Sequence, residues 1–196
     1  MTVVARRGDP ATPTAAIAVP DFLWPELRSD HAGAVMIYRG ILAVSLDAEL
    51  RQFANEHLAT QRQHLRLMEG LVPPERRSRL LGVWRLAGWL TGALPALFGP
   101  RAVFRTIEAV ETFVDQHYAV QTATLTDQDA YRALHDLLEQ CRLDEVEHRD
   151  DAQRRLGPPS AIGRTWAGIV GHGSRVGVVL AARFSAEQAK LRIRAV

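Results

Sequence analysis

Apolar residues recur every three to four positions along most of this 196-residue chain, which is the spacing of one face of an α-helix. No window shows the strict alternation that is typical of a half-buried strand. The predicted helices cover about 30–45, 46–70, 100–125, 131–156 and 161–184, with Ser29 capping the first and Thr126 the fourth. Because short connections favour antiparallel neighbours, the sequence predicts an all-α bundle.

The segment 80–98 is the most apolar part of the chain. Three glycines, Arg85 and Pro95 interrupt it, which argues against a helix of about 20 apolar residues that crosses a membrane. One interpretation is a helical hairpin that lies in the headgroup layer of a membrane, anchored by Trp84 and Trp89. The other interpretation is a buried hairpin of a soluble protein, and the segment by itself leaves both open.

Length and composition limit the remaining alternatives. We expect one domain at 21–184, with a flexible tail at 1–20 and a frayed end at 185–196. The net charge is only +2 and arginines are spread over all the helices, so no nucleic-acid partner is expected. Cys141 is the only cysteine, which excludes an internal disulfide and a cysteine-based metal cage.

Acidic and histidine side chains occur at metal-ligand spacings within the predicted helices. Glu145 and His148 are three residues apart and therefore share one helix face. Such Glu-x-x-His pairs supply ligands in helical carboxylate-metal proteins, although the same spacing also occurs on solvated faces. His57, Gln61 and His64 likewise lie on one face of the second helix, where the alternative is a polar, solvated surface.

Two residues of the third predicted helix extend this candidate site. Glu111 lies in an apolar stretch, and a buried carboxylate needs a cation or a hydrogen-bond donor. Tyr118 follows seven residues later, on the same face two turns away. Both side chains are therefore candidates for the same polar site.

Several short motifs follow one another along about residues 27–184. They are Leu-Arg-Ser-Asp-His-Ala-Gly at 27–33, Ile-Tyr at 37–38, Leu-Gly-Val-Trp at 81–84 with Gly88 and Gly92, Ala-Val-Glu at 109–111, His-Tyr at 117–118 with Gln121, Asp-Glu-Val-Glu-His at 144–148 and Ser-Arg-Val at 174–176. In order and spacing, this series resembles the demethoxyubiquinone hydroxylase family of ubiquinone biosynthesis. An ordered series of this length is more specific than any one of its members.

The resemblance implies a ferritin-like four-helix bundle that holds two irons and uses oxygen to hydroxylate the ring of a demethoxyquinone. It implies a prenylated quinone, a membrane surface and other ubiquinone-biosynthesis proteins as partners, and a peripheral position on the cytoplasmic face of the inner cell membrane. An added apolar hairpin and the last helix would contact the membrane, with Trp84, Trp89 and Leu90 at the quinone entrance. A homo-oligomer stays an open alternative.

The resemblance carries four of the family's iron-ligand positions onto this chain and fails at two. A glutamate that follows Ala-Gly in the family is Ala34 here, and the first residue of the helix-two Glu-x-x-His pair is Gln61. The positions that match are His64, Glu111, Glu145 and His148. Two carboxylates under-neutralise two divalent ions, and a neutral amide is a poor bridging ligand. Two irons, one ion and no ion are therefore the alternatives.

A smaller metal site is one outcome of these departures. With His64 assisting, one ion of iron, manganese or zinc would be held by Glu111, Glu145 and His148. His57 and Glu108 are the candidate replacement ligands. The competing interpretation places both of them at the surface, or in contact with the ligands without binding the metal themselves.

Three functions compete on this basis. The first is an enzyme that hydroxylates a quinone at a remodelled metal site, with Tyr118 as the catalytic residue that orients oxygen or a ligand. The second is a catalytically degenerate relative that binds quinone or acts as a scaffold in the pathway. The third is a bundle in which Glu111 and His148 belong to a structural hydrogen-bond network. Membership of the ubiquinone-biosynthesis pathway is a firmer expectation than retained catalysis.

Overall fold

The computed structural model describes residues 17–20, 23, 26–72, 80–157 and 161–194. In these ranges it contains six α-helices and a short 3₁₀ helix, with no strand. The helices are α1 (Glu26–Val44), α2 (Ala48–Leu71), α3 (Leu81–Ala96), α4 (Pro100–Ala123), η3 (Asp129–Tyr131), α5 (Arg132–Arg154) and α6 (Ala161–Arg194). The all-α prediction is confirmed.

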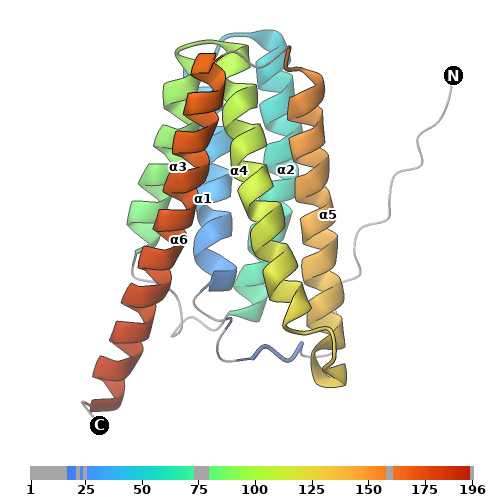
Figure 1. The fold of residues 1–196 in the computed structure, drawn as a ribbon, viewed down its shortest axis with the longest axis vertical. Coiled ribbons are helices and arrows are strands. Elements are labelled where there is room, and N and C mark those ends of the chain that lie inside the picture. The colour runs from blue at the N-terminus through green and yellow to red at the C-terminus, as the bar shows by residue number, and fades with distance from the viewer. Residues whose placement is uncertain (1–16, 21–22, 24–25, 73–79, 158–160, 195–196) are drawn as a thin grey trace, which may run out of the picture.

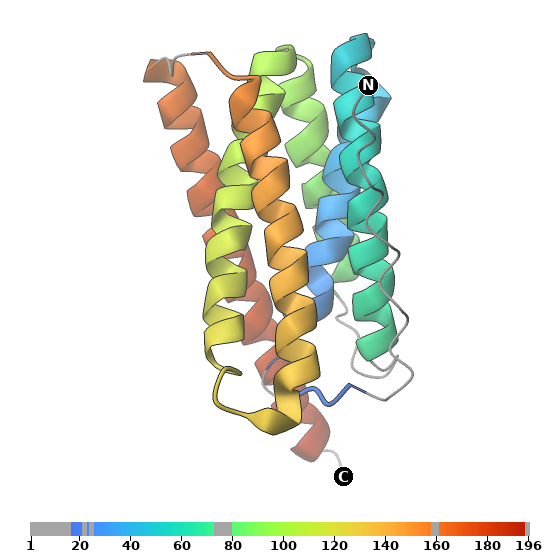
Figure 2. The same cartoon turned by 90° about the vertical axis from the view of Figure 1, so that its right-hand side faces the viewer.

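Four of the helices form a bundle, and two further helices flank it. α1, α2, α4 and α5 stand side by side, while α3 lies against α1 and α6 lies against α4 (Figure 1 and Figure 2). Consecutive helices run in opposite directions, as short connections require. This arrangement is consistent with a ferritin-like bundle that carries two added helices.

Two apolar clusters stabilise the bundle at different heights. One cluster includes Tyr38, Phe53 and Phe104, and the other includes Met68 and Leu138. Along α2, α4 and α5, most of the buried ionisable side chains lie between the positions that belong to these two clusters. The core therefore contains a polar layer with apolar packing on both sides.

The segment 80–98 contains one continuous helix, α3, and the expected hairpin is wrong. Its glycines do not break the helix, because they allow its backbone to lie against α1. A Cβ on Gly88 would lie 2.2 Å from the carbonyl oxygen of Gly33, and one on Gly92 would lie 1.9 Å from that of Ile37. Glycine is required at such positions because no side chain fits between the two backbones.

Some helix boundaries also differ from the expectation. α2 begins after Asp47, whose Oδ1 accepts a 2.8 Å hydrogen bond from the Leu50 amide. Thr126 does not cap the next bundle helix, since its hydroxyl donates to the Thr122 carbonyl and η3 precedes α5. α6 continues past residue 184, because 185–194 is rich in helix-forming Ala, Glu, Gln, Lys, Leu and Arg.

The predicted tail and the frayed end lie partly outside the described residues, at 1–16 and 195–196. Of the part of the tail that is described, Ile17 and Val19 pack against the cluster that includes Met68. This short stretch therefore lies against the bundle.

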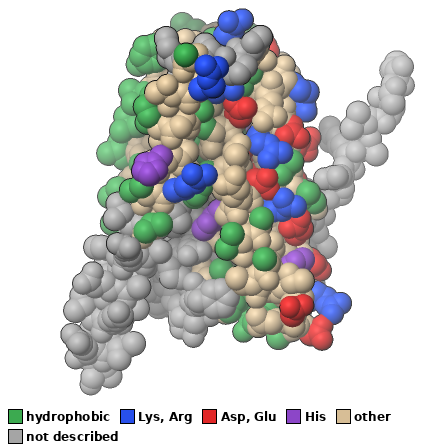
Figure 3. Space-filling view, viewed as in Figure 1, with side chains coloured by type: hydrophobic (Ala, Val, Ile, Leu, Met, Phe, Trp, Pro, Cys, Tyr) green, Lys and Arg blue, Asp and Glu red, His purple; other side chains and the backbone are tan. Residues whose placement is uncertain are grey.

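α3 and α6 carry large apolar side chains on the outside of the bundle. They are Val83, Leu86 and Leu94 on α3, Leu97 and Phe98 just after it, and Ile169, Val176 and Val179 on α6. Figure 3 shows apolar side chains gathered along the edge of the molecule that α3 occupies in Figure 1. None of the helices within the described ranges combines the length and the apolarity that spanning a membrane requires.

Replacing Gly92 by alanine is expected to lower the free energy of unfolding by about 1–3 kcal/mol, because the new methyl group would overlap the Ile37 carbonyl. Gly168 on α6 is the matched control, since nothing lies within 4 Å of a Cβ added there. Its alanine variant is expected to gain roughly 0.5–1 kcal/mol. Urea unfolding followed by circular dichroism measures both, and equal stabilities would contradict the dependence of α3 on this contact.

Candidate metal centre

The polar layer collects ionisable side chains, together with the amide of Gln61, from all four bundle helices. None of its seven main members is more than 8% exposed: His31 from α1, His57, Gln61 and His64 from α2, Glu111 from α4, and Glu145 and His148 from α5. Helix periodicity explains two pairs in this set, Gln61 with His64 and Glu145 with His148, because residues three apart share one face of a helix. The four ligand positions predicted from the sequence all lie in this layer.

Glu145 stands at the centre of the layer. Its Oε1 lies 3.0 Å from Nδ1 of His64, and its Oε2 lies 3.0 Å from Nδ1 of His148. Gln61 Nε2 donates a 2.6 Å hydrogen bond to the same Oε2. Because a carboxylate only accepts, the NH₂ group of Gln61 must face Glu145. The Gln61 Oε1 atom is thereby left buried without a hydrogen-bond partner.

Two histidines of the layer have outer partners. Nε2 of His64 lies 3.0 Å from Oδ2 of Asp144. Nε2 of His31 lies 3.0 Å from the hydroxyl oxygen of Tyr118. In metal sites, partners of this kind fix the orientation of a ligating imidazole and the nitrogen that carries its proton. The predicted catalytic residue, Tyr118, thus contacts a histidine of the layer.

The pKa values of the two buried carboxyl groups, Glu111 and Glu145, are shifted in opposite directions. Burial and the charge of Glu145 raise the pKa of Glu111 well above its usual range, although Tyr38 donates a 3.1 Å hydrogen bond to its Oε1. Burial alone would also raise the pKa of Glu145, but hydrogen bonds from His148 and His64 outweigh it and hold that pKa well below the usual range. Without a metal ion, the layer therefore holds one carboxylate, Glu145, and one carboxylic acid, Glu111.

The imidazole of His64 is a cation in the metal-free protein. Burial alone would lower its pKa, but hydrogen bonds with Asp144, Cys141 and Glu145 raise it to about 12. Histidine binds metals in its neutral form. A metal ion would therefore displace the proton that His64 shares with Glu145.

Two groups of three buried side chains have the spacing of metal ligands, with one ligand atom from each residue within 4.8 Å of the others. We call them the His64 end and the His148 end, and they consist respectively of His31, His64 and Glu145, and of Glu111, Glu145 and His148. Such nitrogen and oxygen donors suit iron, manganese and zinc. The buried Gln61 Oε1, which has no partner, also fits a further group bound in the layer. The residues therefore fit a metal ion.

The two candidate replacement ligands have partners outside these groups. His57 Nε2 pairs with Oδ2 of Asp151 at 3.0 Å, and its ring centroid lies 4.1 Å from that of His148. Glu108 pairs with Arg105 at 2.5 Å. His57 thus packs beside a predicted ligand, whereas Glu108 forms an ion pair within α4.

His31 is the site residue that the sequence analysis did not single out. It precedes Ala34 by three residues and therefore shares its face of α1, one turn away. This spacing was the signal that could have found it. Ala34 itself is partly buried and offers no ligand atom.

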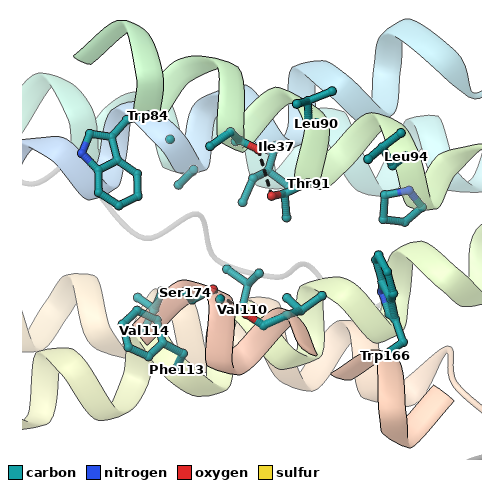
Figure 4. A pocket seen from close by; sticks show the side chains of 17 residues that line it. Ile37, Trp84, Leu90, Thr91, Leu94, Val110, Phe113, Val114, Trp166 and Ser174 are labelled. Atoms are coloured by element: carbon teal, nitrogen blue, oxygen red, sulfur yellow. Dashed lines mark hydrogen bonds between the residues drawn. The ribbon is translucent and has the colours of Figure 1, made fainter. Parts of the chain in front are cut away.

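An apolar cleft of about 330 Å³ lies beside the polar layer. Figure 4 shows its two walls, with Trp84, Leu90 and Leu94 of α3 on one side and Val110, Phe113, Val114 and Trp166 of α4 and α6 on the other. Of the predicted entrance residues, Trp84 and Leu90 line the cleft. The carbonyl of Trp89 instead faces α1, 2.2 Å from where a Cβ on Gly40 would lie.

A smaller inner cavity of about 40 Å³ lies between the cleft and the polar layer. Its lining includes His31, Gln61, Glu111, Tyr118 and Glu145. Ala34, Phe113 and Val114 line both the cleft and this inner cavity. The cleft therefore approaches the polar layer at Ala34, one of the two positions that depart from the family pattern.

A bundle whose facing helices bear buried carboxylates and histidines has the architecture of the helical carboxylate-metal proteins. Residues 22–181 match the family described as ubiquinone biosynthesis protein COQ7. The chain belongs to this family, and the resemblance carried by its motifs is confirmed.

Relatives with assigned names give the same family. The chain is 35% identical over 144 residues to the 3-demethoxyubiquinol 3-hydroxylase of Rhodospirillum rubrum. The matched region covers 72% of this chain and 66% of that protein. It is 30% identical over 167 residues to the human protein named "NADPH-dependent 3-demethoxyubiquinone 3-hydroxylase, mitochondrial". This match covers 80% of the chain and 76% of the human protein. The match thus spans just under two thirds of the bacterial relative and about three quarters of the human one.

Proposed function

We propose that this protein uses molecular oxygen to hydroxylate the ring of a demethoxyquinone in ubiquinone biosynthesis. The relatives' names describe the 3-hydroxylation of 3-demethoxyubiquinol and of 3-demethoxyubiquinone in those proteins. A ring C–H bond becomes C–OH; one atom of O₂ enters the ring, and the other leaves as water with two electrons and two protons from a reductant. The observation that carries the proposal is the buried layer, which brings His64, Glu111, Glu145 and His148 together.

Iron is the proposed cofactor. Amino-acid side chains cannot activate O₂, and the bound iron would supply this chemistry. The chain's own residues hold and shield it. Asp144 orients His64, and Tyr118 orients His31. Tyr118 also lines the inner cavity, where its hydroxyl can orient a bound ligand. The apolar clusters on both sides of the layer exclude water.

The apolar cleft is the proposed quinone route. Its volume of about 330 Å³ falls in the range of small-molecule sites, roughly 300–1,000 Å³. The hydroxyls of Thr91 and Ser174 in its wall both donate to carbonyls of their own helices, so the wall is suited to an apolar ligand. Ala34 ends in a methyl group, which leaves room where the cleft approaches the inner cavity.

A membrane surface is the proposed source of the prenylated quinone. α3 and α6 carry the exposed apolar side chains and also form two walls of the cleft, so the surface that contacts lipid would open into the quinone route. On this proposal the protein is peripheral on the cytoplasmic face of the inner membrane. Other ubiquinone-biosynthesis proteins, and a second copy of this chain, are the proposed protein partners.

Incorporation of labelled oxygen tests the proposed reaction. The purified protein is loaded with ferrous iron and given a short-tailed demethoxyquinone, NADPH or a chemical reductant, and ¹⁸O₂. The expected product is the hydroxylated quinone with one ¹⁸O atom, measured by mass spectrometry. Protein stripped of metal is the control, and equal product from both samples would contradict the proposal.

A second function is favoured by the loss of carboxylates at Ala34 and Gln61. On this alternative, the protein binds a prenylated quinone, or acts as a scaffold, without hydroxylating it. Trp84 and Trp166 line the cleft, so quinone binding would quench their fluorescence. Saturable quenching without any ¹⁸O-labelled product from the iron-loaded protein would favour this alternative over the enzyme.

A further inference from the structure

We infer that the chain binds a single metal ion at the His64 end, with His31, His64 and Glu145 as ligands, and that the Gln61 amide takes the place of a second ion at the His148 end. His31 is not among the ligand positions that the family resemblance carries onto this chain. The inference rests on the proposed function only in taking a metal as the cofactor. Because metal binding is measured without turnover, the inference and the proposed reaction can fail separately.

The His148 end is already occupied by a hydrogen-bond donor. Gln61 Nε2 lies 2.6 Å from Oε2 of Glu145 and 3.4 Å from Nδ1 of His148. Both atoms belong to residues that would hold an ion at this end together with Glu111. An ion there would have to displace the amide, and the buried NH₂ group would lose its carboxylate acceptor, which is unfavourable for a donor that water cannot reach.

The His64 end can take an ion without disturbing Gln61. The Nδ1 atom of His64 faces Oε1 of Glu145, which is the oxygen that Gln61 does not use. Both imidazoles of this end have an outer partner already in place, Asp144 for His64 and Tyr118 for His31. Two histidines and one carboxylate form a common ligand set for a single iron(II), with coordination positions left open.

Charge favours one ion over two. The layer contains two carboxyl groups, Glu111 and Glu145, and one divalent ion balances both when they are ionised. A second divalent ion would leave two buried positive charges without partners, which is strongly unfavourable in a site of low exposure. In this chain a glutamine stands where the family pattern has an additional carboxylate.

Gln61 supplies an independent sign that something binds here. Its side chain is 0% exposed, and its Oε1 atom has no hydrogen-bond partner in the protein. It lines the inner cavity together with His31 and Glu145. Buried acceptors are rarely left unpaired. An ion with its bound water at the neighbouring end would provide the missing donor.

Anaerobic titration of the metal-free, full-length protein with Co²⁺ tests the inference. Visible absorption and calorimetry give the stoichiometry, the affinity and the coordination of the cobalt. We expect one Co²⁺ per chain. His31→Ala should weaken binding by at least about 100-fold, since a ligand costs more than the roughly 10–100-fold of an outer partner. His148→Ala should keep one ion with its affinity within about tenfold.

Gln61→Glu provides the opposite change, because it removes the amide donor and adds a carboxylate at the His148 end. This variant is expected to bind close to two Co²⁺ per chain. Circular dichroism and thermal melts first establish that each variant folds, and His31→Gln and His148→Gln replace any alanine variant that does not. Two ions or none in the unaltered protein, or greater sensitivity to His148 than to His31, would overturn the inference.

Discussion

Replacing Glu145 by glutamine is expected to abolish tight metal binding and to lower the free energy of unfolding of the metal-free protein by about 3–5 kcal/mol. Glu145 belongs to both groups of possible ligands, so neither group keeps three members without it. The same carboxylate pairs with the cationic His64 in the absence of metal. The variant would leave that buried cation with only part of its counter-charge.

Glu147→Gln is the matched control, because it makes the same chemical change two residues later at an exposed position of α5. Its stability is expected to stay within about 0.5 kcal/mol of the unaltered protein. Urea unfolding after treatment with a chelator measures stability, and Co²⁺ titration measures binding. If the Glu145 variant still bound one ion with its affinity reduced less than tenfold, the layer could not be the metal site described here.

The metal-free protein is expected to lose stability as the pH falls below 7, and His57 to contribute about 3 kcal/mol of that loss by pH 4. Burial, and then the charge of His148, lower the pKa of His57 from 6.5 to about 4, while Asp151 offsets only part of the effect. Between these two pH values the unfolded chain takes up a proton that the folded protein does not. The loss of stability due to His57 thus begins near pH 6.5 and grows until the pH approaches 4.

His57→Gln isolates this contribution, because glutamine can still donate a hydrogen bond to Asp151 but does not titrate. Urea unfolding at pH 7, 6, 5 and 4 gives the stability of both proteins. The advantage of the unaltered protein over the variant should shrink steadily with decreasing pH. A constant difference between the two would mean that His57 takes up its proton equally in the folded and unfolded states.

The bundle helices could be predicted because each carries its own apolar stripe, whereas the local signals for their ends were less reliable, as Thr126 shows. α3 could not, since the glycines that suggested a hairpin act through a partner helix. Gly88 and Gly92 are four residues apart and lie on one face, where the backbone of α1 takes the space of their missing side chains. Nothing local in the sequence identifies that partner.

The candidate site was predictable in its members and not in its detailed geometry. Spacing and family motifs pointed to His64, Glu111, Glu145 and His148, which the structure gathers in one layer. They did not show that Asp144 and Glu145, adjacent in sequence, contact the two different nitrogens of His64. Nor could they give the orientation of the Gln61 amide, because it depends on α5, which is more than 70 residues away in the chain.

The glycine contacts of α3 also determine which part of the cleft can move. α3 and α1 approach each other through their backbones, which leaves little room for one to shift against the other, whereas the contacts of α6 described here involve side chains. The Trp84 ring lies against Gly177, and Trp166 Nε1 donates a 2.8 Å hydrogen bond to Thr106 Oγ1. Helices that are packed through side chains slide past one another by small rearrangements. A sideways displacement of α6 alone would thus widen the cleft for a bulky ligand. The four bundle helices, and with them the side chains of the polar layer, would keep their positions.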